Sequence, residues 1–221
     1  MKVILVNGSP HKEGCTFTAL SEVEKTLNEE GIETEIFWIK TKPITGCIAC
    51  LKCGEKGECA FDNDVVNEFV KKAYDADAFV FGSPVYYAGA NGSMTSFLDR
   101  AFYSNSHGDG AKAFKHKPGA VVCSARRAGT TATYDQLIKY LGISQMPIIS
   151  SYYWNMVHGN TPEEVLQDEE GLSTMRQLGR NIAFFLKCLE AGDEKGLTLN
   201  EEPKARTNFI RYFLYLLILF F

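Results

Sequence analysis

The sequence predicts a three-layer α/β domain in which a doubly wound parallel sheet of five strands carries helices on both faces. Short apolar runs end abruptly at turn residues, which is typical of strands buried on both faces. A segment with apolar residues at helical spacing follows each run, and this strand–helix order recurs five times along the 221 residues. A chain of this length is expected to form one such domain.

The strands are predicted where short runs rich in apolar residues lie between turn residues. The run at 3–6 is wholly apolar and stops at 7–10 (NGSP), and the run at 78–81 stops at 82–84 (GSP). The run at 34–39 instead alternates polar and apolar residues. The complete set of predicted strands is 3–6, 34–39, 78–81, 119–123 and 147–150.

The helices are predicted from apolar residues spaced three or four positions apart. In the first helix Phe17, Leu20, Val23 and Leu27 share one face, and Gly31 closes the helix. The last helix begins with acidic residues, as the helix dipole favours. The predicted helices are 16–29, 64–74, 93–103, 131–141 and 163–189.

Composition excludes several classes of protein. The formal net charge is −4 with no basic tract, which argues against nucleic-acid binding. No stretch of ~18 apolar residues is present, so no membrane span is expected, and the first residues lack a signal-peptide pattern. We therefore expect a cytoplasmic protein, whose seven cysteines are thiols, metal ligands or redox groups rather than a disulfide framework.

Two segments depart from the strand–helix alternation. Residues 41–63 form a 23-residue connection after the second strand, predicted as a cysteine-rich insertion. Connections longer than ~12–15 residues inside a compact domain usually have a function. Residues 212–221 are ten consecutive apolar or aromatic residues, to which we assign no role. The expected domain is therefore 1–211, with 212–221 as an apolar tail.

The loop after the first strand is a candidate anion site. In a doubly wound sheet this loop leads into a helix whose first N–H groups are unpaired and whose dipole is positive at that end. Ser9, Thr16 and Thr18 add hydroxyl donors, which suit a phosphate monoester. The loop has neither the Walker A nor the GxGxxG pattern. The alternative is an ordinary helix N-cap, in which these residues serve the turn alone.

Two further loops leave the carboxyl ends of strands, where ligands bind in open α/β sheets. The loop after the third strand carries Tyr86 and Tyr87, whose flat faces suit a ring. The loop after the fourth strand carries Arg126 and Arg127, which suit charge on a reduced ring or an incoming nucleotide phosphate. The alternative is that the tyrosines are packing residues and the arginines a solvated pair.

The motifs of these loops carry a family resemblance. They are Gly-Ser-Pro-x-x-x-Gly-x-Thr from residue 8, Ser-Pro-Val-Tyr from residue 83, Phe-Leu-Asp-Arg from residue 97 and Ser-Ala-Arg-Arg from residue 124. This set resembles the NADPH-dependent FMN reductase family from residue 1 to about residue 211. The resemblance implies a flavodoxin-like fold with strand order 2-1-3-4-5 and FMN as a bound cofactor.

The same resemblance implies the FMN-binding residues. Those after the first strand would hold the phosphate, and the other two groups would line the isoalloxazine ring. His11 stands where the family frequently has Arg, and Cys15 where it frequently has Asn or Ser, although a backbone contact at Cys15 is unaffected. The full set is Ser9, His11, Cys15, Thr16, Phe17, Thr18, Pro84, Val85, Tyr86, Tyr87, Ser124, Ala125, Arg126, Arg127 and Gly129. No side chain is assigned as a catalytic acid or base.

Four cysteines in the insertion have the spacing C-x2-C-x2-C-x5-C. They are Cys47, Cys50, Cys53 and Cys59. Three interpretations are open: a [4Fe–4S] cluster, a structural zinc ion, or free or redox-active thiols. The spacing resembles that of the iron–sulfur flavoproteins, a branch of the same family, and this resemblance implies the cluster. Cys123 and Cys188 lie in apolar patterns and are expected in the core.

The expected function is electron transfer from a reduced donor, NAD(P)H or a ferredoxin-like protein, through FMN to a small-molecule or protein acceptor. Alternatives are a cluster-free NAD(P)H:FMN or quinone reductase and a non-enzymatic carrier of the flavodoxin type. The resemblance also implies a homo-oligomer, a dimer or tetramer. Residues 146–159, with Tyr152, Tyr153 and Trp154, are the candidate contact, and local packing is the alternative.

Overall fold

The computed structural model describes residues 1–205, apart from the side chains of residues 55 and 56. Its five main strands are parallel and lie in the order β2-β1-β3-β5-β6, which is the predicted order 2-1-3-4-5 counted along the chain. They are β1 (Lys2–Asn7), β2 (Glu33–Trp38), β3 (Ala78–Tyr86), β5 (Gly119–Ala125) and β6 (Met156–His158). A short strand, β4 (Gly89–Ala90), pairs antiparallel with the end of β3. The predicted doubly wound α/β sheet is confirmed.

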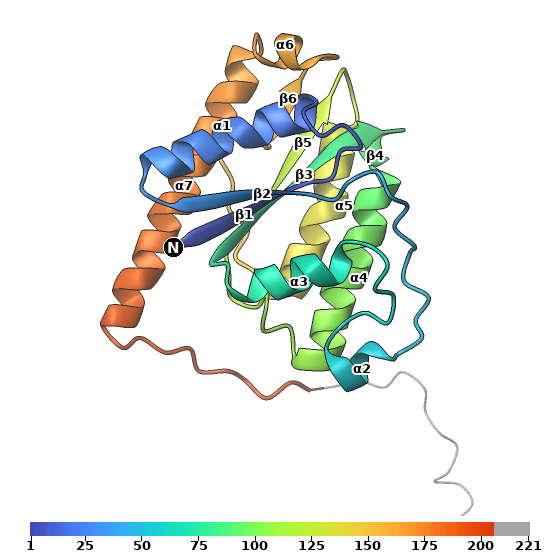
Figure 1. The fold of residues 1–221 in the computed structure, drawn as a ribbon. Helices are drawn as coiled ribbons and strands as arrows, with labels where there is room; N and C mark the ends of the chain where they lie inside the picture. The colour runs from blue at the N-terminus through green and yellow to red at the C-terminus, as the bar shows by residue number, and fades with distance from the viewer. Residues whose placement is uncertain (206–221) are drawn as a thin grey trace, which may run out of the picture. The chain divides into compact units, whose positions relative to one another are not determined.

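Helices cover both faces of this sheet (Figure 1). Alternate residues of β1 explain why: Val3 and Leu5 belong to one buried apolar cluster, while Ile4 and Val6 belong to the other. The first cluster is completed by α1 (Cys15–Glu29) and by α7 (Glu169–Glu194) up to Leu189, and the second by α3 (Val66–Tyr74), α4 (Gly92–Asp109) and α5 (Thr130–Ile143). Two single-turn helices complete the set, α2 (Cys53–Lys56) and α6 (Pro162–Val165).

The fifth strand differs from its prediction at 147–150. Ile148 makes only an isolated parallel bridge to Gly119, and the chain leaves the sheet before β6 resumes the pairing. Asn155 fixes this return, because its side chain donates to the Val121 carbonyl (3.0 Å) and its carbonyl accepts from the Cys123 N–H (2.9 Å). The expected strand is therefore wrong in extent, because a side chain replaces part of the strand ladder.

The predicted helix 163–189 is divided into α6 and α7. Thr161 caps α6 by accepting from the Glu164 N–H (3.3 Å), and Asp168 starts α7 by accepting from the Gly171 N–H (2.9 Å). Two capping residues seven positions apart each begin a helix, so one continuous helix does not form.

The described chain forms two units, Met1–Leu189 and a second unit that begins at Glu190. The described part of the second unit is the end of α7 and an irregular segment up to residue 205. The expected domain end at 211 and the apolar tail 212–221 lie outside the described residues. Among residues 1–205, no helix combines the length and apolarity needed to cross a membrane.

Candidate functional site

Three loops meet at the carboxyl ends of β1, β3 and β5. The Gly8 N–H donates to the Gly82 carbonyl (2.9 Å), which joins the loop after β1 to β3. The hydroxyls of Thr16 and Ser124 share a buried hydrogen bond of 2.8 Å, which joins the start of α1 to the end of β5. These three loops, which the sequence predicted as a binding site, therefore form one connected structure at the edge of the sheet. We call this edge the rim.

Gly129 brings the loop after β5 against the hairpin formed by β3 and β4. Its φ is +102°, and a Cβ at this position would lie 2.7 Å from the Ala88 Cα and 2.9 Å from the Val85 Cγ1. The two turn residues of the hairpin, Tyr87 and Ala88, have φ of 49° and 57°, which non-glycine residues rarely adopt. Such strain persists only where the surroundings hold it, and it is common at binding sites.

The three helices that begin at this rim differ in how their amino termini are capped. The Asn91 side chain caps α4 by accepting from the Ser93 N–H (2.8 Å) and the Met94 N–H (3.3 Å). In contrast, α1 and α5 begin after Gly14 and Gly129, and neither helix has a side-chain cap. The first amides of α1 are therefore available to an anionic group.

The predicted FMN residues differ in exposure along this rim. Ser9, Thr16, Ser124 and Ala125 are buried; Cys15, Phe17, Thr18, Pro84, Val85 and Gly129 are half-buried; His11, Tyr86, Tyr87, Arg126 and Arg127 are exposed. The Ser9 hydroxyl accepts from the His11 N–H (3.1 Å), so its own hydrogen can point to a ligand. The structure thus brings all three predicted groups to one edge of the sheet.

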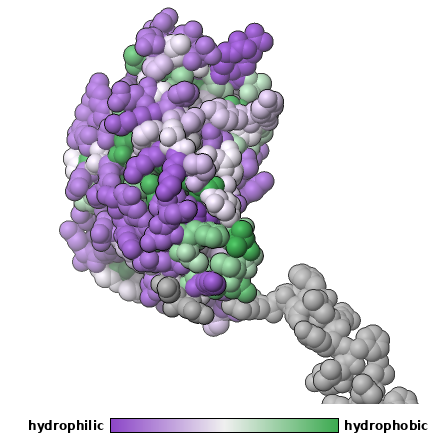
Figure 2. All heavy atoms as spheres, turned by 45° about the vertical axis from the view of Figure 1, so that its right-hand side comes forward, coloured by the Kyte–Doolittle hydropathy of each residue, from purple (hydrophilic) through white to green (hydrophobic). Residues whose placement is uncertain are grey.

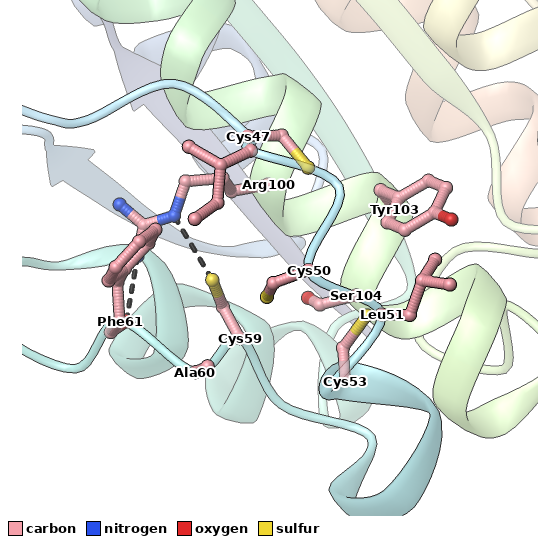
Figure 3. A pocket seen from close by; sticks show the side chains of 11 residues that line it. Cys47, Cys50, Leu51, Cys53, Cys59, Ala60, Phe61, Arg100, Tyr103 and Ser104 are labelled. Carbon is pink, nitrogen blue, oxygen red and sulfur yellow. Dashed lines mark hydrogen bonds between the residues drawn. The ribbon is translucent and has the colours of Figure 1, made fainter.

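The four clustered cysteines, which lie between β2 and α3 in the sequence, line one pocket. Figure 3 shows them around this pocket, with Arg100 and Phe61 at one end and Tyr103 and Leu51 at the other. Their exposure differs: Cys53 is buried at the start of α2, Cys59 is half-buried, and Cys47 and Cys50 are exposed. The structure therefore brings the predicted ligand set together.

The backbone and the electrostatics of this pocket are unusual. Ala49 and Leu51, on either side of Cys50, have φ of 51° and 61°. Alternating left-handed residues turn neighbouring amides to one side, an arrangement found at many phosphate and iron–sulfur sites. Burial, together with the nearby cysteines, raises the pKa of the Cys53 thiol. Within residues 1–205, no three His, Cys, Asp or Glu side chains stand where one metal ion could join them.

Apolar side chains extend the surface beside the pocket. Ile48 and Leu51 are 62% and 56% exposed, although both are large and hydrophobic. Figure 2 shows a hydrophobic patch low on the face that carries this segment.

Two residues that hold Cys59 were not predicted as site residues from the sequence. Arg100 on α4 is fully buried and donates from Nε to the Cys59 sulfur (3.1 Å), and its guanidinium forms an ion pair with Asp64. Asn67 on α3 accepts from the Cys59 N–H (2.9 Å) and donates to the Cys59 carbonyl (2.9 Å). The available signals for Arg100 were the Phe-Leu-Asp-Arg motif that it ends and its position beside the buried Leu98 and Ala101 of an apolar helix face.

The two cysteines that were expected in the core differ in burial. Cys123 is buried in β5, and burial raises the pKa of its thiol to about 12. Cys188 is exposed on α7, so its expected core position is wrong. The helix presents this position to solvent although its neighbours Leu186 and Ala183 are buried.

Comparisons with known proteins agree with the fold. The chain is 33% identical over 196 residues to an iron–sulfur flavoprotein of Methanocaldococcus jannaschii, covering 86% of this chain and all of that protein. A solved NAD(P)H:quinone oxidoreductase from Methanothermobacter marburgensis superposes with a TM-score of 0.63 at 16% identity, covering 82% and 96% of the two chains. An archaeal flavodoxin superposes with a TM-score of 0.57 at 15% identity, covering 85% and 99%.

The match to a family pattern covers the three rim loops and the cysteine-rich residues 41–63. Residues 1–161 match the pattern described as NADPH-dependent FMN reductase. This region contains every residue predicted from the resemblance, from Ser9 to Gly129. The chain therefore belongs to the NADPH-dependent FMN reductase family of oxidoreductases.

Proposed function

We propose that this FMN-dependent oxidoreductase also holds a [4Fe–4S] cluster, and that it passes electrons from NAD(P)H or a reduced ferredoxin-like protein to a small-molecule or protein acceptor. One observation carries the proposal. Four cysteines within 13 residues of sequence line a single pocket, in the same unit as the rim of three connected loops. The name of the relative from Methanocaldococcus jannaschii supports the same pairing of cofactors.

The rim fits FMN in two respects. The uncapped amides of α1, with the hydroxyl of Ser9, suit the phosphate, which needs donors rather than an obligatory cation. The exposed Tyr86 and Tyr87 rings offer flat surfaces to the isoalloxazine, and Arg126 supplies positive charge on the other side. When bound, FMN supplies redox chemistry in steps of one or two electrons. The protein binds, orients and shields it.

The cysteine pocket fits a cluster by its donor set. Four thiolates are the ordinary ligands of [4Fe–4S], and crowded thiols resist ionisation unless a metal compensates their charge. The raised pKa of Cys53 shows this resistance, since burial and the nearby thiols are among its causes. A cluster at this pocket would exchange single electrons.

The proposal includes a homo-oligomer in which the segment between Ile148 and β6 forms a contact. Tyr152, Tyr153 and Trp154 are 59%, 51% and 48% exposed on this segment. Exposed aromatic side chains are typical anchors of protein interfaces. Light scattering of the wild type and of Trp154→Ser tests it: the variant should have the lower mass, and a monomeric wild type would refute the contact.

The central experiment is the composition of protein purified without oxygen. Wild type should contain FMN, about four irons and about four acid-labile sulfides per chain, with cluster absorption that dithionite bleaches. Cys59→Ser should lose the iron and keep FMN. Cys188→Ser is the matched control, because Cys188 is exposed on α7 and outside the pocket. Iron absent from the wild type, or equal in both variants, would refute the cluster.

A turnover assay separates an enzyme from an electron carrier. The anaerobic holoprotein is mixed with NAD(P)H or a reduced ferredoxin and then with quinones as acceptors. Sustained turnover supports the proposed oxidoreductase. A single reduction without turnover by any donor would instead favour a carrier of the flavodoxin type.

A further inference from the structure

We propose that Arg100 is a positioning residue that raises the reduction potential of the cluster by donating to the sulfur of Cys59. The inference rests on the proposed function, because it requires a cluster at the four cysteines. Arg100 ends the Phe-Leu-Asp-Arg motif that begins at residue 97, but neither that motif nor the cysteine spacing assigns it this role.

Arg100 is held in one orientation by three partners that lie between residues 45 and 64. Its side chain has no exposed surface, and that of Asp64 is 2% exposed. The terminal nitrogens donate to Asp64, to the Thr45 carbonyl (3.3 Å) and to the Phe61 carbonyl (2.7 Å). Only Nε is left for Cys59, at 3.1 Å from its sulfur (Figure 3). A buried guanidinium that is bonded at all three nitrogens cannot turn away from that sulfur without breaking these bonds.

The Cys59 sulfur, as the acceptor of this hydrogen bond, indicates that Arg100 has more than a structural role. A neutral thiol is a weak acceptor, and a buried charged donor aimed at it is poorly satisfied. A thiolate that ligates iron carries negative charge, which makes the same contact a charge-assisted hydrogen bond. The geometry around Arg100 therefore suits Cys59 as a ligand better than it suits Cys59 as a free thiol.

Cys59 is fixed on its backbone side as well. Asn67 pairs with both the N–H and the carbonyl of Cys59, at 2.9 Å each, and Asn67 is itself 2% exposed. Cys47 and Cys50 are exposed and lie in an irregular segment. Cys59 is thus a ligand whose backbone and sulfur both have protein partners before any cluster binds.

The effect on the potential follows from charge. Reduction adds one negative charge to a cluster, and a hydrogen bond or positive charge at a ligand sulfur stabilises the reduced state. Arg100 therefore raises the potential. Asp64 opposes it, because its carboxylate offsets part of the guanidinium charge. Removing the charge of Arg100 should therefore lower the potential, and removing the charge of Asp64 should raise it.

The test compares midpoint potentials of anaerobic holoproteins at one pH, followed by electron paramagnetic resonance. Arg100→Gln should lower the equilibrium constant for reduction at least tenfold, about 59 mV for one electron, and Arg100→Lys should recover part of this loss. Asp64→Asn should raise the potential, and asparagine still accepts the Val66 N–H that Asp64 accepts (3.1 Å). Asp135→Asn removes the same charge from the exposed face of α5 and should cause no shift.

Opposite shifts for the Arg100 and Asp64 variants support the inference. Unchanged potentials, or shifts in the same direction, would overturn it. If Arg100→Gln loads no iron, Asp64→Asn decides alone, because an unshifted potential there refutes the role of the ion pair. Failure of the proposed function looks different: the wild type itself then contains no iron or sulfide.

Discussion

The contact at Gly129 makes the sharpest prediction about the rim, because one substitution can be compared with the same substitution elsewhere in α5. In Gly129→Ala the new Cβ must occupy a left-handed residue, at a cost of ~1–2 kcal/mol. It also meets the Ala88 Cα at 2.7 Å and the Val85 Cγ1 at 2.9 Å. Overpacking of this kind typically costs ~1–3 kcal/mol, so we expect a total loss of about 2–5 kcal/mol.

Gly142→Ala is the matched control. Gly142 lies near the end of the same helix, and nothing lies within 4 Å of the position its Cβ would take. Replacing a helical glycine by alanine gains ~0.5–1 kcal/mol. The same chemical change at the two ends of α5 should therefore have opposite signs.

The assay is urea unfolding of the FMN-free protein, followed by titration of FMN into the folded variants. We expect Gly129→Ala to weaken FMN binding at least about tenfold, a loss of ~1.4 kcal/mol, because the hairpin at Val85 and Ala88 must move away from the loop. Gly142→Ala should bind FMN as the wild type does. The reasoning fails if Gly129→Ala matches the wild type in stability, or if the two variants change FMN affinity equally.

Three further predictions concern stability. Thr133→Val should stabilise by ~1 kcal/mol in urea unfolding, because the buried Thr133 hydroxyl has no partner among the described residues; a loss of stability would contradict this. Asn91→Ala should cost ~1 kcal/mol by removing the α4 cap on Ser93 and Met94, whereas Asn91→Asp should cost little. Burial raises the pKa of Cys123 from 9.0 to about 12, so its thiol stays protonated in the folded protein while the unfolded chain ionises. Its contribution is therefore complete below about pH 9 and is lost as the pH rises towards about 12; Cys123→Ala should flatten that decline in unfolding free energy.

The sequence predicted those parts of the fold that depend on local pattern. Val3 to Val6 are apolar at every position because both faces of β1 are covered, so the run indicated a central strand without any knowledge of its neighbours. The strand at 147–150 failed for the opposite reason. This segment pairs with β5 only at Gly119. The next bonds to β5 join Asn155 to the Val121 carbonyl and the Cys123 N–H, 34 and 32 positions earlier in the chain, and no local pattern records such bonds.

The candidate site likewise has a part that local spacing predicts and a part that depends on contacts between distant residues. Spacing alone placed four cysteines around one pocket, because residues three positions apart in a short loop must lie near one another. It did not identify Arg100, whose partners Asp64, Cys59 and Thr45 lie 36, 41 and 55 positions away. Yet burying a guanidinium in an apolar helix face is costly unless charge and hydrogen bonds compensate it. An arginine beside the buried Leu98 and Ala101 therefore implied a polar partner, and residues 45–64 supply it.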